Sequence, residues 1–216
     1  MKYLSKMGLL VVMLFTLVAC NIERIVDTPI GKWEVTYAAL ELRLADGTVI
    51  QGTTMGEIRD GLVEALQTQI KDLPNITIKT LVSIVLSEED ANSPVVPEGS
   101  ARMEFFEDET LVCWRLEKEL WEQTSHWEES GRGEWSYAQG NMTLYIDQVV
   151  YKCAVEKLTN KRLYMKMEYP DLSSLTNNWE DPATRAEEGF DLGAYSELIS
   201  ILMGMQISVD LQLAHL

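Results

Sequence analysis

The chain has little cysteine, histidine or positive charge. It contains three cysteines and two histidines, His126 and His215, and no Cys-x-x-Cys or His-x-x-x-His spacing occurs. A structural zinc site is therefore not expected. Lys and Arg total 18 against 34 Asp and Glu, a formal net charge of −16. Nucleic acids bind to clusters of Lys and Arg, so this composition argues against a nucleic-acid partner.

Motifs that carry catalysis are also missing. The sequence has no nucleophile elbow, phosphate-binding loop, dinucleotide fingerprint or metal-ligand cluster. Acidic pairs follow from the abundance of acids, and we interpret Glu88-Glu89-Asp90, Glu187-Glu188 and Glu128-Glu129 as solvated surface charge. We expect neither an enzyme nor a bound cofactor or metal.

The N-terminus has the organisation of an export signal. Lys2 and Lys6 precede an apolar run over residues 7–19, which is shorter than the ~20 apolar residues that cross a bilayer. The run ends Leu-Val-Ala-Cys at residues 17–20, which resembles the lipobox of bacterial lipoproteins. The resemblance implies a signal peptide over residues 1–19 and a lipid on Cys20. The alternatives are an ordinary signal peptide and a single transmembrane anchor.

Lipidation would anchor the protein to a membrane rather than make it span one. Removal of Lys2 and Lys6 with the signal leaves 16 basic against 34 acidic side chains, a net charge of −18. Asn21 follows the cysteine, where an aspartate would resemble an inner-membrane retention signal. We therefore expect a cell-envelope protein, anchored in the outer membrane on a face left open. Residues 20–29 form the lipidated N-terminus and linker, and residues 30–216 form one domain.

Most of that domain is predicted to consist of short strands. Alternating apolar and polar residues and tight turns recur from Gly31 onward, with turn signals at Asp46-Gly47, Gly131–Gly133 and Gly140-Asn141. Residues 76–86 are rich in β-branched side chains and are predicted as a further strand.

Two helices interrupt the strands. Residues 54–72 have an amphipathic pattern that begins with a capping box at Thr54 and Glu57 and ends before Pro74. Residues 186–203 have a similar pattern that ends at Gly204. The fold class is therefore mainly β, an antiparallel barrel of about 8–10 strands with two added helices. An α+β sandwich or a split barrel is the alternative.

The strand pattern resembles the lipocalins. Gly31-Lys32-Trp33 resembles the Gly-x-Trp that opens their first strand, and Gly133-Glu134-Trp135 with the following Gly140-Asn141 turn is similar to lipocalin-like domains of bacterial lipoproteins. The resemblance covers residues 31–169 and implies a calycin-type barrel whose floor is closed by Trp33. The helix at residues 54–72 has no place in a plain lipocalin.

The lipocalin-like barrel suggests two functions. Trp121, Gln123, Ser125 and Trp127 would share one face of a strand, an apolar lining with a few polar groups that is typical of a ligand cavity. This predicts a barrel that binds a small apolar or amphipathic molecule. The tryptophans could instead fill an ordinary core or stack on sugars. The alternative function is a structural or interaction lipoprotein that contacts an envelope protein or glycan; a protein partner is not identified.

The two remaining cysteines, Cys113 and Cys153, each lie in a strand-like run. An exported protein folds where disulfides form, so a bridge between the two strands can be drawn. Two buried free thiols fit the same pattern, and the sequence leaves both alternatives open.

Overall fold

The computed structural model describes residues 23–70, 74, 77–80, 82, 91–119, 124–170, 200–201 and 204–216. Its strands and long helix are β1 (Gly31–Arg43), β2 (Val49–Gly52), α2 (Met55–Gln69), β3 (Ala101–Phe105), β4 (Thr110–Glu119), β5 (Thr124–Ala138), β6 (Asn141–Ile146), β7 (Val149–Leu158), β8 (Arg162–Glu168) and β9 (Gln206–His215). Among these residues no helix is long and apolar enough to span a bilayer.

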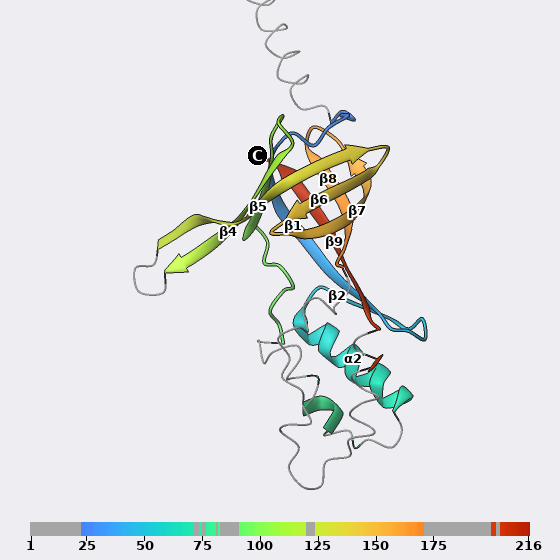
Figure 1. The fold of residues 1–216 in the computed structure, drawn as a ribbon. Coiled ribbons are helices and arrows are strands. Elements are labelled where there is room, and N and C mark those ends of the chain that lie inside the picture. Colours follow the sequence, from blue (N-terminus) through green and yellow to red (C-terminus); the bar gives the residue numbers. More distant parts are fainter. Residues whose placement is uncertain are drawn as a thin grey trace, which may run out of the picture.

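The strands form one closed antiparallel barrel. β1 pairs with β3, each strand from β3 to β8 pairs with the next one along the chain, and β9 pairs with β1 to close the barrel (Figure 1). These eight strands make the barrel, and β2 is a ninth strand attached to β1. One edge of β1 is shared, because Gly31–Glu34 pair with β3 whereas Leu40–Arg43 pair with β2. The predicted fold class is confirmed.

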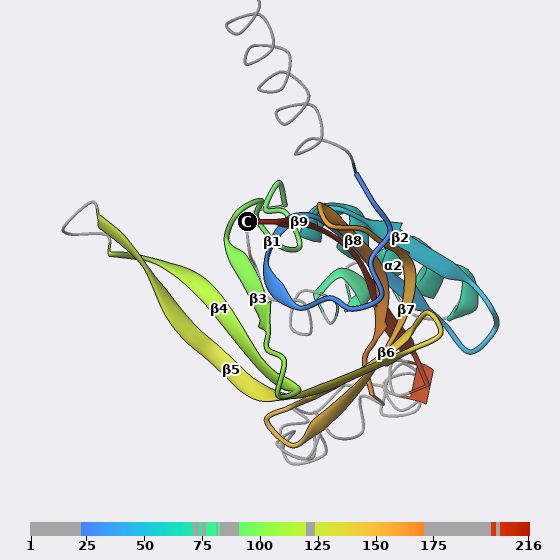
Figure 2. The same ribbon diagram turned by 90° about the horizontal axis from the view of Figure 1, so that it is seen from above.

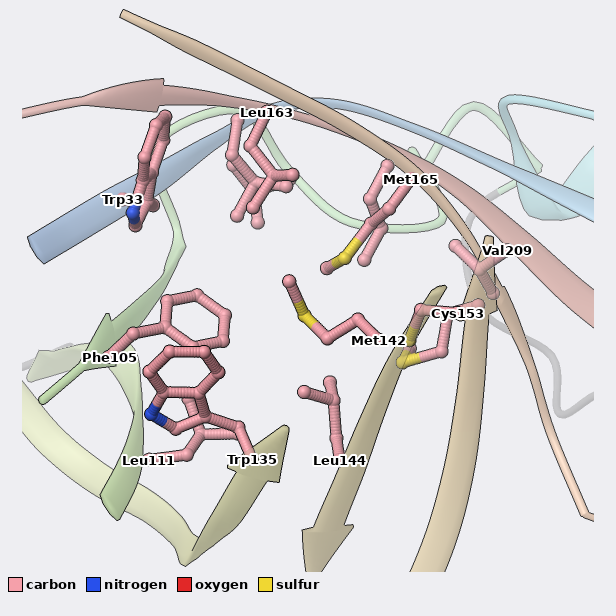
Figure 3. Packing of buried hydrophobic residues seen from close by; sticks show 14 of the residues in the cluster. Trp33, Phe105, Leu111, Trp135, Met142, Leu144, Cys153, Leu163, Met165 and Val209 are labelled. Atoms are coloured by element: carbon pink, nitrogen blue, oxygen red, sulfur yellow. The ribbon is translucent and has the colours of Figure 1, made fainter. Parts of the chain in front are cut away.

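The barrel interior is packed with apolar side chains. Inward-facing residues from every barrel strand form one buried cluster (Figure 3). Its members are Trp33, Val35, Ala38, Phe105, Leu111, Trp135, Met142, Leu144, Cys153, Leu158, Leu163, Met165, Met167, Val209, Leu211 and Leu213. In small barrels side chains fill the interior, and this barrel follows that rule.

A second core lies where β1 and β9 extend past the barrel. There β1, β2 and α2 bury Leu42, Ile50, Ile58, Leu62 and Leu66, among others. Leu40 packs against both clusters, so the inner face of β1 is continuous from one core to the other. Figure 1 shows α2 beyond one end of the barrel, alongside β2.

The N-terminus of α2 is the predicted capping box. The Thr54 hydroxyl accepts a hydrogen bond from the Glu57 amide at 3.2 Å, and the Glu57 carboxylate accepts one from the Thr54 amide at 3.3 Å. The helix ends at Gln69, earlier than the predicted residue 72. Of the second predicted helix, residues 200–201 are helical and residues 186–199, 202 and 203 lie outside the described part.

The strand predicted at residues 76–86 is wrong for the residues of this range that the structure describes. Residues 77–80 and 82 are helical, and the amides of Thr77 and Ile78 donate to the carbonyl of Pro74 at 2.9 and 3.3 Å. Ile78 and Val82 are both buried in the second core. Side chains four residues apart share a helix face, so their burial against α2 outweighs the strand preference of β-branched residues.

The turn predicted at Gly131–Gly133 is also wrong. β5 runs through both glycines, and its register against β4 shifts between Cys113 and Trp114. A Cβ at Gly133 would collide with the carbonyl of Tyr145 on β6, so this glycine permits a close strand approach. The β4–β5 hairpin is consequently much longer than its neighbours.

The long hairpin projects from the barrel as an arm, defined here as residues 116–119 of β4 and 124–132 of β5. β3 pairs with β4 up to Arg115, and β6 pairs with β5 from Gly133 onward. Within the described residues, the strands of the arm pair only with each other. Figure 2 shows the arm extending away from the barrel wall.

Candidate functional site

The proposed lipidation residue, Cys20, lies outside the described residues, but the segment that follows it is placed. Glu23 accepts hydrogen bonds from Lys157 Nζ and Thr159 Oγ1, both at 2.9 Å. The Arg24 amide donates to Asn160 Oδ1 at 2.8 Å, and Ile25 forms a β-bridge with Thr159. The predicted linker is therefore bound to the β7–β8 turn from Glu23 onward.

Two of the four predicted cavity residues, Trp121 and Gln123, also lie outside the described residues. Ser125 is exposed and Trp127 is half-buried, and both lie on the arm. The guanidinium of Arg102 lies 3.7 Å from the centroid of the Trp127 ring. Neither Ser125 nor Trp127 belongs to the cluster inside the barrel. The described residues therefore place this stretch of β5 on the arm and not inside the barrel.

Trp33 closes one end of the barrel. Its Nε1 donates to the Pro29 carbonyl at 2.6 Å, and its ring meets that of His215 edge to face at 4.9 Å between centroids. Gly31 has φ +129, and a Cβ there would collide with the His215 ring. The Gly-x-Trp motif thus combines a glycine that gives His215 space with a tryptophan that fills the floor. Trp33 and Trp135 are core residues, as the sequence indicated.

The two cysteines are free thiols, Cys113 half-buried on β4 and Cys153 buried on β7. Of the two alternatives left by the sequence, the structure has the unpaired one. Burial raises the pKa of Cys113 to about 11 and that of Cys153 to about 12. Because only the thiolate is nucleophilic, neither side chain has the chemistry of a catalytic cysteine.

A groove of about 600 Å³ lies on the outer wall of the barrel along β9, with β1 on one side and β8 on the other. Its charged residues on β1 and β8 alternate with core residues, so their side chains point outward, whereas Met205 is itself buried in the second core. The lining is Glu41, Arg43, Lys166, Glu168, Tyr169, Gly204, Met205, Gln206, Ile207 and Ser208. The volume is within the range of ~300–1,000 Å³ that is typical of small-molecule sites.

The charges of the groove form a local network. Lys166 Nζ donates to Glu41 Oε2 at 2.7 Å across β9, and Arg43 Nη2 donates to Glu41 Oε1 at 3.2 Å. The hydrogen bond from Lys166 is the main reason that the pKa of Glu41 lies below its ordinary value, and burial opposes the shift. The groove therefore presents two cations and two carboxylates beside the exposed Tyr169 and the half-buried Ile207.

The sequence did not single out these groove residues. Glu41 and Lys166 are 125 positions apart and occupy ordinary outward positions of two amphipathic strands. Only barrel closure places β1 and β8 on either side of β9, and no local pattern encodes which strands close a barrel. A weak signal existed in β8, where Lys166 alternates with the core residues Met165 and Met167.

A smaller groove of about 460 Å³ separates the β2 hairpin from α2. Its lining includes the acids Asp46, Glu57 and Glu64. Asp46 accepts hydrogen bonds from Thr48 and from Gln69 Nε2, the latter at 2.7 Å, and Glu57 belongs to the helix cap. The carboxylates of Asp46 and Glu57 thus have structural roles. No group of three or more His, Cys, Asp or Glu within the described part could hold a metal ion.

The closed eight-stranded antiparallel barrel is compatible with a lipocalin-like fold. α2 and its core are an addition between the first two barrel strands, as the sequence indicated. No family model, no curated protein and no solved structure compared with this chain matches it.

Proposed function

We propose that this protein is a non-enzymatic envelope lipoprotein that binds a small amphipathic molecule in the groove between β1, β8 and β9. The observation that supports it is the groove itself, about 600 Å³ with charged groups of both signs beside apolar side chains. An anchor on Cys20 would hold this site at a membrane, where amphipathic molecules concentrate.

The chemistry of the lining favours a ligand with a dipolar head group. Lys166 and Arg43 would meet its negative group, while Glu41 and Glu168 would meet its positive group. Tyr169 and Ile207 offer an apolar surface to the remainder of the molecule. Because Lys166 and Glu41 already neutralise each other, a ligand of large net charge would leave one partner unpaired.

The packed interior supports the outer groove over the barrel lumen. The residues that point inward form a continuous cluster that includes three large aromatic rings, those of Trp33, Phe105 and Trp135. Phe105 and Trp135 contact each other edge to face at 5.6 Å between centroids. A ligand inside the barrel would have to displace these side chains, whereas the outer groove needs no such rearrangement.

The groove is tested by titrating the protein with dodecylphosphocholine, a zwitterionic single-chain amphiphile, below its critical micelle concentration. Gln206→Trp places a large ring in the groove, and Gln212→Trp makes the same change on the same outward face of β9 outside it. We expect calorimetry to show binding by the wild type and Gln212→Trp but not by Gln206→Trp. Absence of wild-type binding, or equal binding by both variants, contradicts the proposal.

The lipid anchor has a separate test. Mass spectrometry of the N-terminal peptide of protein extracted from membranes should show a chain that begins at Cys20 and carries acyl groups. An unmodified Cys20 contradicts the anchor and leaves the groove proposal standing.

The arm favours a second function, contact with an envelope protein. Past Leu116, whose amide donates to the Ser100 carbonyl, neither outer edge of the arm pairs with another strand in the part of the chain that the structure describes. Open edges accept a further strand from a partner. Benzoylphenylalanine at Glu128 on the arm and at Tyr145, an exposed residue on the barrel wall, forms a matched pair for photocrosslinking in cells. We expect a discrete protein adduct from position 128 only. Equal adducts, or none, contradict this function.

A further inference from the structure

The short distance between Cys20 and the bound segment fixes which end of the barrel would face the membrane. Glu23 is held on the β7–β8 turn by Lys157 and Thr159. Three residue steps separate it from Cys20, and an extended chain spans at most ~3.3–3.6 Å per residue, so the tether can reach at most about 10 Å. A lipid on Cys20 therefore holds the β7–β8 turn within about 10 Å of the membrane surface.

Side chains at that end gather positive charge on an acidic protein. Arg24 and Arg162 are exposed and Lys161 is half-buried. The backbone connects them, because Arg24 pairs with Asn160 and the His215 amide donates to the Lys161 carbonyl at 2.9 Å. Glu23, whose charge acts on Arg162, is already bound to Lys157.

Exposed aliphatic side chains lie among these cations. Ile25 is 86% exposed although its backbone is fixed by the bridge to Thr159, and Leu216 is 55% exposed. The Leu216 amide donates to the Lys32 carbonyl at 3.0 Å, which places it beside the start of β1. Large aliphatic side chains exposed beside Lys and Arg are typical of surfaces that insert into the head-group layer of a membrane.

The same end of the barrel is acidic on its other side. The β3–β4 turn carries Glu107, Asp108 and Glu109. An anionic membrane would repel this turn and attract the β7–β8 turn. The charge distribution therefore selects one side of the barrel end, the side to which the tether leads.

We infer that the surface formed by Arg24, Ile25, Lys161, Arg162 and Leu216, named here the anchor surface, rests on an anionic phospholipid bilayer. Its cations contact lipid phosphates, and Ile25 and Leu216 enter the head-group layer. The inference rests on the proposed lipid anchor and adds an orientation to it: α2, at the opposite end of the barrel, then points away from the lipid, and the arm extends sideways from the barrel wall (Figures 1 and 2). The groove opens on a wall that is roughly perpendicular to the membrane.

The test uses the full lipidated chain, reconstituted in vesicles of phosphatidylcholine mixed equally with phosphatidylglycerol. A bimane label is placed at Ile25→Cys on the anchor surface or at Val49→Cys, an exposed site on β2 at the opposite end. Lipids with a nitroxide on the head group should quench the first label strongly and the second weakly. Cys113 and Cys153 are poorly reactive, and unmutated protein provides the labelling blank.

Charge dependence distinguishes docking from tethering alone. In Lys161→Glu with Arg162→Glu, quenching at position 25 should fall toward its value in pure phosphatidylcholine. The matched control, Arg115→Glu with Lys118→Glu on β4, should leave the quenching at position 25 unchanged. Raising the ionic strength to about 1 M, where the Debye length is ~3 Å, should lower the quenching at position 25 as the Lys161→Glu and Arg162→Glu changes do.

Each failure has its own signature. Protein that stays off the vesicles and has an unmodified Cys20 refutes the anchor. Lipidated protein on vesicles with equal quenching at positions 25 and 49 overturns the inference. Quenching at position 25 that is unchanged by Lys161→Glu with Arg162→Glu overturns it as well.

Discussion

Arg102 joins three strands by lying between Trp127 and Glu34. Its guanidinium is 3.7 Å from the centroid of the Trp127 ring, and its Nε and Nη2 donate to Glu34 Oε2 at 2.8 and 2.6 Å. Glu34 belongs to β1, Arg102 to β3 and Trp127 to β5. These contacts fix the base of the arm to the barrel wall, since among the described residues the two strands of the arm pair with no other strand.

The contact between Arg102 and Trp127 predicts a cost for Arg102→Lys. Lysine keeps the charge but loses the planar stacking surface and one of the two hydrogen bonds. We expect the free energy of unfolding to fall by about 1 kcal/mol in urea denaturation. Trp127→Ala should cost less in the Arg102→Lys background than in the wild type. Strictly additive losses would contradict the coupling, and Arg115→Lys, an exposed arginine on β4, is the control.

Gly31 and Gly47 form a matched pair for testing the barrel floor. Both have positive φ, +129 and +89, but a Cβ at Gly31 meets His215 whereas one at Gly47 meets nothing within 4 Å. Gly47→Ala should cost about 1 kcal/mol for the backbone alone. Gly31→Ala adds the collision, which we expect to cost a further ~1–3 kcal/mol. His215→Ala in the Gly31→Ala protein should recover part of this loss; no recovery would contradict the packing.

The thiols predict slow modification of the folded protein. The pKa values of Cys113 and Cys153 are raised by burial to about 11 and about 12, so both are protonated at neutral pH. A thiol reagent such as dithionitrobenzoate should react slowly with native protein and rapidly in denaturant. Rapid reaction of the folded state would show that the strands open. A disulfide between the two residues in purified protein would contradict the free pair.

Glu41 predicts a loss of stability in acid. Its pKa is lowered below the ordinary value of 4.5, mainly by the hydrogen bond from Lys166. The native state therefore binds a proton less readily than the unfolded chain, so the contribution is complete above pH 4.5 and is lost as pH falls through the lower native value. The melting temperature of Glu41→Gln should be below that of the wild type at neutral pH, and the two melting temperatures should converge in acid. Curves that remain parallel would contradict the pairing.

Strand positions were predictable because alternation is a local property. The strands that contain Met142, Leu144 and Leu163 follow a period of two, and each such residue is buried. The helical conformation of residues 77–80 and 82 was not predicted, because Ile78 and Val82 satisfy a strand composition as well as a helix spacing. Their burial against α2 is a tertiary contact, which composition does not report.

The site was less predictable than the fold for the same reason. Ser125 and Trp127 alternate as cavity residues would, but the pattern does not reveal that the β4–β5 hairpin extends past its neighbours. A barrel wall and a projecting arm have the same alternation. The groove at Glu41 and Lys166 depends on strands from opposite ends of the chain, and only the closed barrel brings them together.

We expect the 13-residue strand β1 to couple the unfolding of the two cores. Its inner face supplies Trp33 to the floor of the barrel, Leu42 to the core beneath α2, and Leu40 to both. Neither core can melt without releasing backbone on which the other depends, so the two should unfold in a single transition. A cavity made beneath α2, as in Leu62→Ala, would therefore lower the melting temperature of the barrel although Leu62 is not part of the barrel core.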